Sequence, residues 1–576
     1  QTMKISNETP VQCEREQDAR ACEVAEESQR IMRKMKQEAG ERLEPALKAG
    51  AVAAPDVYSA HEAEAVLAEG GNAVDAAVAA AFVLSVTYPE AGNIGGGGFM
   101  NIHYDGSPYF LDYRECAPAN ARRDMYLDEA GEVVPGVCVV GRHSVAVPGT
   151  VRGLWDAHRR FGTLPWQRLV APAIRYAKQG FVVHRQLIER RDVMLADFEG
   201  KTNFARFFGA MKEGGVFRQP VLGDTLDRIA RFGADEFYLG ATAERLVRQL
   251  SDLDVPITKD DLRHYRSIWR EPLVAHWHGY EVVTAPPPSS GGIGLLQLLK
   301  MKDALSAAFA GVEHNSTQYV HLIAEMSKRV FADRAEYLGD PAFQAMPVDA
   351  LLEPAYIRRR AAAIDLAVPT RVDAVQPGLE ESEETTHFSI IDKFGNAVSN
   401  TYTLNSKFGS GVVVVGAGFL LNNDMDDFSA KPGAANRFGL VGADANAIAP
   451  GKRMLSSMTP TILTKDGRVS LVIGTPGGSR IFGSIFQVIN NVHAFDMPLA
   501  KAVAKMRVHH QLLPVNTVYW EPYAPIEGVL AEELVARGYN LQPRFTNGDI
   551  QVIRVDGDMP EAASDPRARG TVRLVN

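Results

Sequence analysis

The composition of the chain changes at residue 385, and this change constrains the possible fold more than any other feature of the sequence. Residues 380–384 read EESEE, and the following TTHFSII has the β-branched and aromatic composition of a strand. Taken alone, the stretch is most simply an acidic surface loop that enters a strand. The sequence differs on the two sides of this point, however, and the difference needs a further explanation.

The sequence before residue 385 favours helices, and the sequence after it favours strand hairpins. Between about residues 150 and 370, helical windows such as DTLDRIARFGADEFYLGATAERLVRQLSDL alternate with turn clusters such as APPPSSGG. After residue 385, the turns DKFGN and KDG each lie between two strand-like runs, and QVIRVDGDMPEAASDPRARG predicts a closing strand pair. With a helix expected in GGSRIFGSIFQVINNVHAF, the chain should combine helices with hairpins packed against them.

Three local patterns before residue 150 predict particular structures. The charged residues 14–48 favour helix by propensity, and GGNAVDAAVAAAFVLSV predicts a buried helix capped by Asn72. The glycine run at residues 95–98 lacks the GK[ST] ending and the GxGxxG context of phosphate-binding loops. We therefore expect a sharp turn or a close approach of two backbones there.

Composition excludes several classes of function. The chain has 576 residues, 46% of them apolar, and a net charge of −9, which argues against a nucleic-acid partner. Its longest apolar runs, residues 76–86 and 411–421, are too short to cross a bilayer, so we expect a soluble protein with no membrane span. The chain begins QTMKIS, without an apolar leader, so a secretion signal either has been removed or never existed.

The cysteines do not predict a metal site. No CxxC or HExxH motif is present, and we expect neither a metal nor another cofactor. Cys13 and Cys22 are close enough in sequence for a disulfide in an oxidising compartment, but two free thiols are an equal alternative. Cys116 and Cys138 are the remaining two.

Thr385 offers an explanation for the change of sequence. A threonine hydroxyl is a weak nucleophile until a base lies beside it, and the α-amino group of an N-terminal threonine can be that base. Thr385 gains such an amino group only if the Glu384–Thr385 bond is cut. The hypothesis is an exposed acidic linker that is cleaved, followed by a strand that becomes a new N-terminus.

Several motifs occur in the same order as in one protein family, and their joint presence makes the resemblance specific. TTHFSIIDKFGNAVSNTYTLNSKFG, LLNNDMDDFS, KRMLSSMTPT and GTPGGSR resemble the small subunit of γ-glutamyltranspeptidases, and GGNAVDAAVA, GNIGGGGFM, DYRECAPA and APPPSSGG resemble the large one. The resemblance covers nearly everything after residue 50. It implies an α+β fold of the N-terminal-nucleophile hydrolases: a four-layer αββα sandwich of two stacked, mainly antiparallel sheets flanked by helices.

The resemblance also implies how the chain is divided into subunits and where in the cell it is located. We expect a charged helical N-terminal segment at residues 1–49, a large subunit at 50–384 and a small subunit at 385–576, which share one body after self-cleavage. The two fragments are then partners of one another. A periplasmic or secreted location is expected.

The implied activity is glutathione hydrolysis and γ-glutamyl transfer to water or to the amine of an amino acid or peptide. Thr385 matches the nucleophile and Thr403 a threonine that hydrogen-bonds near it, and Gly477 and Gly478 match the backbone amides that stabilise the oxyanion. Removing one such donor typically lowers the rate by about 10²–10³.

A γ-glutamyl donor carries an α-carboxylate and an α-ammonium, and the resemblance implies contacts for both. Arg114, Ser456 and Ser457 match the residues that hold the carboxylate, a task that suits the bidentate guanidinium. The residues that match the ammonium site are Asn405, Asp424 and Asp427.

Two positions depart from the family pattern. Asp424 stands where Gln or Glu is common. Because its side chain is shorter, we expect it to contact the donor ammonium through a water molecule. Phe438 stands where the lid loop often has Tyr, so a hydroxyl latch is absent and the balance between hydrolysis and transfer is open.

Two alternatives stay open. A glutaryl-cephalosporin-type acylase uses the same nucleophile on a donor without an ammonium, although an unpaired Asp427 carboxylate in a dry pocket would then be costly. The other alternative is an inactive binding protein on the same fold.

Overall fold

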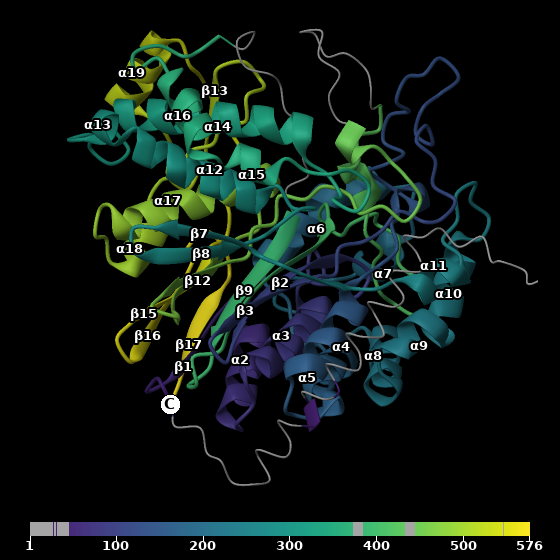
Figure 1. Ribbon diagram of the computed structural model, residues 1–576. Helices are drawn as coiled ribbons and strands as arrows, with labels where there is room; N and C mark the ends of the chain where they lie inside the picture. Colours follow the sequence, from purple (N-terminus) through teal and green to yellow (C-terminus); the bar gives the residue numbers. More distant parts are fainter. Residues whose placement is uncertain (1–26, 28–29, 32–44, 372–383, 432–443, 545) are drawn as a thin grey trace, which may run out of the picture.

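Two stacked β-sheets lie between two layers of helices in the computed structural model of the protein (Figure 1). The structure describes residues 27, 30–31, 45–371, 384–431, 444–544 and 546–576. The predicted α+β sandwich of four layers is therefore confirmed. The predicted N-terminal helical segment lies almost wholly outside the described residues, and its prediction stays untested.

The first sheet has seven strands in the order β17-β1-β9-β10-β2-β3-β6, and every neighbouring pair is antiparallel. Its strands are β1 Gly50–Ala54, β2 Gly97–Tyr104, β3 Ser107–Asp112, β6 Ile268–Arg270, β9 Glu384–Ile391, β10 Ala397–Asn405 and β17 Thr571–Val575.

The second sheet has six strands in the order β16-β15-β12-β11-β8-β7, again antiparallel throughout. Its strands are β7 Leu273–Trp277, β8 Tyr280–Thr284, β11 Thr461–Lys465, β12 Arg468–Gly474, β15 Gln551–Asp556 and β16 Met559–Ser564. Two small sheets pair β4 Phe181–Val182 with β5 Val216–Phe217, and β13 Thr517–Trp520 with β14 Asn540–Pro543.

Helices cover the outer face of each sheet (Figure 1). The layer on the first sheet contains α2 Val57–Ala68, α3 Ala73–Thr87, α4 Thr150–Phe161, α5 Trp166–Gln179 and α8 Pro220–Phe232. The layer on the second contains α12 Gly291–Ala304, α14 Thr317–Tyr337, α16 Pro354–Ala362, α17 Ile481–His493 and α18 Leu499–Ala504.

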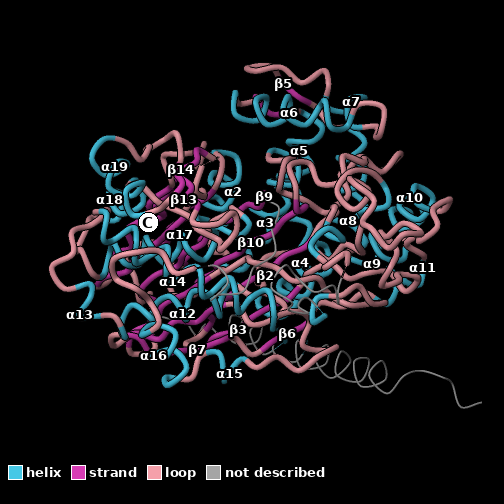
Figure 2. The backbone as a smooth tube through the Cα atoms, turned by 90° about the horizontal axis from the view of Figure 1, so that it is seen from above, coloured by secondary structure: helices cyan, strands magenta, loops and turns pink. Residues whose placement is uncertain are grey.

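The remaining helices lie around this sandwich. Figure 2 shows α6 and α7 with β5 at one edge, and α9, α10 and α11 together at one end. These and the other short helices are α6 Arg185–Phe198, α7 Phe204–Phe208, α9 Ala234–Leu239, α10 Ala241–Leu250, α11 Lys259–His264, α13 Ser306–Phe309, α15 Val348–Leu351 and α19 Gly528–Arg537. In the part of the chain that is described, no helix is both long and apolar enough to cross a membrane.

The predicted buried helix is α3, and its start has the predicted cap. The Asn72 side chain accepts from the Asp75 backbone N–H, and the Asp75 carboxylate accepts from the Asn72 N–H, so two otherwise unpaired donors are satisfied. All its residues are buried because it lies between the first sheet and the helices α2, α4 and α5.

The glycine run brings two backbones together, as predicted. A Cβ atom on Gly95 would lie 2.0 Å from the Leu420 carbonyl oxygen, and one on Gly96 would lie 2.0 Å from that of Thr403. Any larger residue would push β10 away from this turn.

Both sides of residue 385 contribute strands to both sheets. β1 lies between β17 and β9, and β10 pairs with β9 and with β2. In the second sheet, β8 pairs with β11. If the chain were cut after residue 384, backbone hydrogen bonds in both sheets would therefore still join the two fragments.

Candidate active site

Thr385 is the second residue of β9, a strand in the middle of the first sheet, and only 6% of it is exposed. The β9–β10 register is regular as far as Thr386 opposite Tyr402 and then shifts, so that Glu384 lies opposite Asn405. Such an irregularity re-aims side chains near the end of a strand. Here it turns Thr403 towards the peptide bond between Glu384 and Thr385.

Thr403 contacts the bond that we expect to be cut. Its Oγ1 donates to the Glu384 carbonyl oxygen at 2.6 Å and accepts from the Asn405 backbone N–H at 2.7 Å. A hydroxyl that donates to this carbonyl polarises it and can stabilise the negative charge that forms when a nucleophile attacks.

Arg114, which follows β3, joins both predicted aspartates. It is 1% exposed, and its Nη2 lies 2.7 Å from Asp427 Oδ2, while Nη1 lies 3.4 Å from Asp424 Oδ1. The guanidinium also donates to the carbonyls of Met454 and Leu455, just before Ser456. The structure thus brings together residues 114, 424, 427 and the 456–457 segment.

These contacts correct one step of the sequence argument. The case against a glutaryl donor assumed that Asp427 has no charged partner when no ammonium is bound. Arg114 is such a partner, so the cost of an unpaired Asp427 carboxylate does not apply. Asp424 also contacts Arg114 directly, a contact that its shorter side chain did not predict.

Arg334 and Ser290 belong to the same neighbourhood, although the sequence did not point to them. Arg334 Nε donates to Ser290 Oγ at 2.8 Å, and Ser290 Oγ donates to the Ser456 carbonyl at 3.0 Å and lies 3.5 Å from Ser457 Oγ. Burial lowers the pKa of Arg334 to about 10, and the charges of Asp427 and Arg114 also act on it. Arg334 is therefore a second cation of this site, carried by α14.

Glu115 is a buried acid next to Arg114 in the chain. Among the described residues, neither of its carboxyl oxygens has a hydrogen-bond partner. Burial raises the pKa of Glu115 to about 8, although Arg114 works in the opposite direction. Glu115 is therefore largely uncharged at neutral pH.

The site holds charges of both signs. Arg114 and Arg334 carry two positive charges, and Asp424 and Asp427 carry two negative ones when ionised. Within the described residues, Asp424 Oδ2 is buried and accepts no hydrogen bond. A ligand with one positive and one negative group fits this site without changing its net charge.

The side-chain hydrogen bonds of Asn405 reach Asn423 and Asp426 rather than Asp424 or Asp427. It has a φ of 84°, and its Nδ2 donates to the Asn423 carbonyl at 3.2 Å and to Asp426 Oδ2 at 3.5 Å. Asp426 Oδ1 also accepts from Cys138 Sγ at 3.3 Å. Burial, and then the charge of Asp427, raise the pKa of Asp426 to about 6.

Gly477 and Gly478 follow β12 and have φ angles of 132° and 55°. This left-handed region favours glycine and turns the backbone sharply before the 3-10 turn Gly478–Arg480. The loop starts close to β9, because a Cβ on Gly474 would lie 2.2 Å from the His387 ring. Ser479 Oγ donates to Gln511 Oε1 at 3.0 Å and anchors the far side of the turn.

Some predicted positions cannot be placed. Phe438, Cys13 and Cys22 lie outside the described residues. Within the described part of the chain, Cys116 and Cys138 take part in no disulfide.

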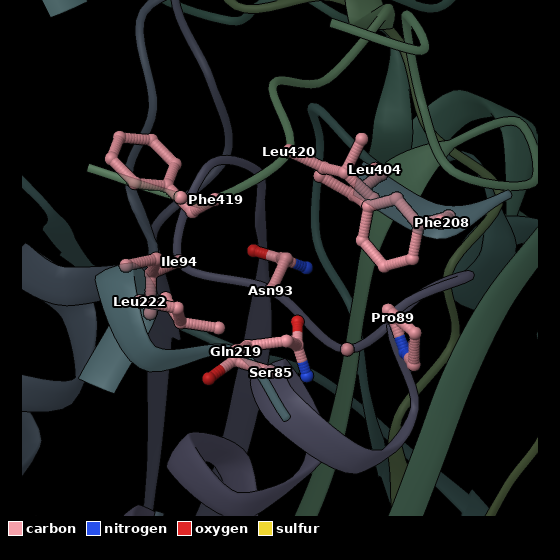
Figure 3. Close-up of a pocket in the computed structure, with 12 residues that line it drawn as sticks. Ser85, Pro89, Asn93, Ile94, Phe208, Gln219, Leu222, Leu404, Phe419 and Leu420 are labelled. Atoms are coloured by element: carbon pink, nitrogen blue, oxygen red, sulfur yellow. The ribbon is translucent and has the colours of Figure 1, made fainter. Parts of the chain in front are cut away.

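A small cavity lies apart from these groups (Figure 3). Its volume of about 10 Å³ has room for a single water molecule, and most of its lining is apolar, with Phe208, Leu222 and Leu404 among the lining residues. None of the predicted site residues lines it. We interpret it as a packing defect behind β10.

Comparisons with known proteins find relatives that match most of this chain. The sequence model of the gamma-glutamyltranspeptidase family matches residues 59–575. A glutathione hydrolase proenzyme of Pseudomonas aeruginosa is 61% identical over 92% of this chain and 95% of its own length.

Two solved structures share the fold. The cephalosporin acylase of Bacillus halodurans has a TM-score of 0.79 at 27% identity and covers 92% of this chain and 97% of its own. The γ-glutamyltranspeptidase of Pseudomonas nitroreducens, complexed with L-DON, has a TM-score of 0.57 at 54% identity and covers 58% of this chain and all of its own.

Proposed function

The chain belongs to the γ-glutamyltranspeptidase family, and from this premise we propose that it splits γ-glutamyl amides such as glutathione through an ester on Thr385. The products are the released amine and a γ-glutamyl group, which passes to water or to another amine. The observation that carries the proposal is the pairing of Arg114 with both Asp424 and Asp427.

Self-cleavage precedes turnover in this proposal. The Thr385 hydroxyl attacks the Glu384 carbonyl carbon, its proton passes to the Thr385 nitrogen, and the peptide becomes an ester. Water then cleaves the ester and leaves a carboxylate on Glu384 and a free amino group on Thr385. The Thr403 hydroxyl, 2.6 Å from the Glu384 oxygen, supports this step because it stabilises the developing negative charge.

Donor recognition uses the charges around Arg114. The α-carboxylate binds the guanidinium with help from Ser456 and Ser457, and the α-ammonium binds Asp424 and Asp427 beside Asn405. The unpaired Asp424 oxygen suits an ammonium, since a buried acceptor without a donor costs free energy.

The chemistry then takes place at Thr385. The Thr385 hydroxyl attacks the γ-carbonyl of the donor. The new α-amino group of Thr385 takes the proton of this hydroxyl and passes it to the leaving amine. The amides of Gly477 and Gly478 stabilise the oxyanion. Water or an acceptor amine cleaves the ester and restores Thr385.

A glutaryl donor fits this site less well. It brings a carboxylate but no ammonium, so it adds a net negative charge beside Asp424 and Asp427 and gives them no cation.

The division into subunits at residues 50–384 and 385–576 and a periplasmic or secreted location are parts of the same proposal. The shared sheets support a lasting association of the two fragments. The proenzyme name of the P. aeruginosa relative is consistent with processing.

A denaturing gel and one assay test the proposal. Wild-type protein should give two fragments, of 384 and 192 residues (576 − 384 = 192), and should hydrolyse a γ-glutamyl anilide. Thr385→Ala should stay a single chain without activity, and Thr385→Ser should retain part of both functions. Cleavage of Thr385→Ala at the same bond would show that another group is the nucleophile, and an uncleaved, inactive wild-type chain would favour the binding-protein alternative.

A further inference from the structure

The proposed oxyanion donors lie in a short turn between β12 and α17. We call residues 475–480 the oxyanion turn, in which Gly477 is the cap of the 3-10 segment and Gly478 is its first residue. Backbone N–H groups at such a start have no acceptor inside the helix, and the dipole of the following α17 favours a negative charge there. How well the turn stabilises an oxyanion therefore depends on how firmly these two N–H groups are aimed.

The oxyanion turn follows β12 at the Thr385 end of β9. Ile473, the next-to-last residue of β12, accepts from Ser399 Oγ at 2.9 Å, and a Cβ on the last residue, Gly474, would lie 2.2 Å from the His387 ring. In the β9–β10 register, His387 is two residues closer to Thr385 than the residue opposite Ser399. β12 therefore advances along β9 towards Thr385, and the turn continues from its end.

The Gln511 side chain holds the far side of the oxyanion turn. Its Oε1 accepts from Ser479 Oγ at 3.0 Å and lies 2.9 Å from His509 Nε2, which is also 3.4 Å from Ser479 Oγ. Since an amide oxygen only accepts, both neighbours donate to it, and this network assigns the His509 proton to Nε2. All three side chains are buried, so a lost hydrogen bond leaves a polar atom unpaired.

Other contacts fix the segment that carries Gln511. Gln487, on α17, makes two hydrogen bonds with the Val508 backbone, one in each direction, at 3.0 Å. His509 and Tyr519, on β13, exchange two backbone hydrogen bonds, at 3.2 and 2.8 Å. Gln511 is thus held by contacts outside the oxyanion turn and provides a fixed point for it.

The histidine of this network is uncharged. Burial, and then the charge of Arg480, lower the pKa of His509 well below its ordinary value, although the hydrogen bond with Gln511 acts in the opposite direction. The charges of His510 and Arg544 lower it further. The contacts of Gln511 therefore do not change with protonation around neutral pH.

We propose that Gln511 is a positioning residue for turnover: because it accepts from Ser479, it aims the two glycine N–H groups of the oxyanion turn at the γ-carbonyl oxygen of the donor. The inference rests on the proposed function, since it needs the ester chemistry at Thr385. Gln511 itself touches neither the donor nor Thr385 in this role and acts only through the turn.

The proposal separates the two reactions of Thr385. In the uncleaved chain, the Glu384 carbonyl oxygen accepts from Thr403 Oγ1 at 2.6 Å, so self-cleavage has a hydrogen-bond donor outside the oxyanion turn. Turnover of a γ-glutamyl amide depends on the turn. Loss of the Gln511 contact should therefore slow turnover and leave self-cleavage nearly unchanged, whereas a general loss of structure would slow both.

The test replaces Gln511 by leucine, which has a similar size but accepts no hydrogen bond. In Gln511→Leu, kcat for a γ-glutamyl anilide should fall about 10–100-fold, because misdirected N–H groups stabilise the oxyanion less. The inhibition constant of glutamate, a product that occupies the donor site without an oxyanion, should change less than about threefold. The rate of self-cleavage, followed on denaturing gels, and the pH profile of kcat should stay those of the wild type.

Ser479 provides an independent pair of variants. Ser479→Ala removes the hydroxyl that donates to Gln511 and should lower kcat about tenfold. Ser479→Thr keeps a hydroxyl and should keep most of the wild-type kcat. As a matched control, Gln219→Leu removes an amide that donates to the Val86 carbonyl at 3.0 Å, next to α8, and should keep the wild-type kcat.

Each failure has a distinct meaning. A wild-type kcat in Gln511→Leu overturns the inference, and so does an equal slowing of self-cleavage and turnover. If Gln511→Leu does not fold, Ser479 decides: a wild-type kcat in Ser479→Ala, or a kcat in Ser479→Thr as low as in Ser479→Ala, overturns the inference. If instead the wild-type chain neither splits nor hydrolyses the anilide, the proposed function itself is wrong.

Discussion

Two buried acids, Glu325 and Glu115, lie in opposite kinds of surroundings. Glu325, on α14, accepts from Lys328, Arg329 and both the N–H and the hydroxyl of Thr370. Glu115, beside the donor site, has no hydrogen-bond partner for either oxygen in the described part of the chain. Glu325 thus accepts from four donors, whereas burial is the largest influence on Glu115.

The pKa values move in opposite directions for the same reason. Burial alone would raise the pKa of Glu325, but Lys328 and the Thr370 and Arg329 contacts hold it below its ordinary value. For Glu115, burial prevails and the pKa rises to about 8. In a buried structural cluster, every charged group has a partner. In a site that binds a charged ligand, some hydrogen-bond acceptors stay unpaired until the ligand arrives.

The largest expected effect comes from breaking the saturated cluster. Glu325→Gln leaves Lys328 and Arg329 buried without their counter-ion, and loss of one partner of a buried pair costs about 3–5 kcal/mol. Urea unfolding in the uncleaved Thr385→Ala background should show this loss. A loss below about 1 kcal/mol would mean that water replaces the carboxylate.

Asp427→Ala should have the next largest effect, on activity rather than on stability. The donor ammonium loses one of two carboxylates, and because Asp424 remains we expect kcat/KM for a γ-glutamyl anilide to fall about 10²–10³-fold. The matching glutaryl anilide, which has no ammonium, should lose much less.

Two further results would sharpen the assignment of Asp427. Asp424→Ala should act in the same direction but more weakly, since its shorter side chain predicts a contact with the ammonium through water. Equal losses on both anilides in Asp427→Ala would show that Asp427 only positions Arg114.

Arg114→Lys should weaken donor binding about 10–100-fold although the charge is kept. An ammonium cannot reproduce the contacts that one guanidinium makes with two aspartates and the Leu455 carbonyl. Steady-state kinetics with glutathione should show mainly a higher KM. Unchanged kcat and KM would remove Arg114 from the site.

The sequence predicted those parts that depend on local signals. The Asn72 cap, the β9–β10 hairpin and the close glycine turn each follow from neighbouring residues, and the structure has all three. The family motifs also pointed to Arg114 and the aspartates, which the structure brings together. The roles of these residues stay predictions.

The sequence could not predict the contacts that depend on packing between distant segments. Arg334 lies in an ordinary helical stretch, and only the packing of α14 against the Ser290 turn brings it to Arg114. The pair of Lys407 with Glu384 needs the irregular register of β9 and β10. An uncharged Glu115 follows from burial, which spacing along the chain does not reveal.

Glu115→Gln should change stability by an amount that depends on pH. The folded pKa, about 8, lies above the ordinary 4.5, so the folded state binds one more proton than the unfolded state between these values. The contribution of Glu115 to stability is then fully present below about pH 4.5 and is lost as pH rises towards 8, by about 1.4 kcal/mol per pH unit. Glutamine has nearly the same shape and does not titrate. In the Thr385→Ala background, the free energy of unfolding of Glu115→Gln relative to Glu115 should therefore rise at this rate between pH 5.5 and 7.5. A difference that stays constant with pH would show that Glu115 is ionised in the fold, and that a further negative charge lies beside Arg114.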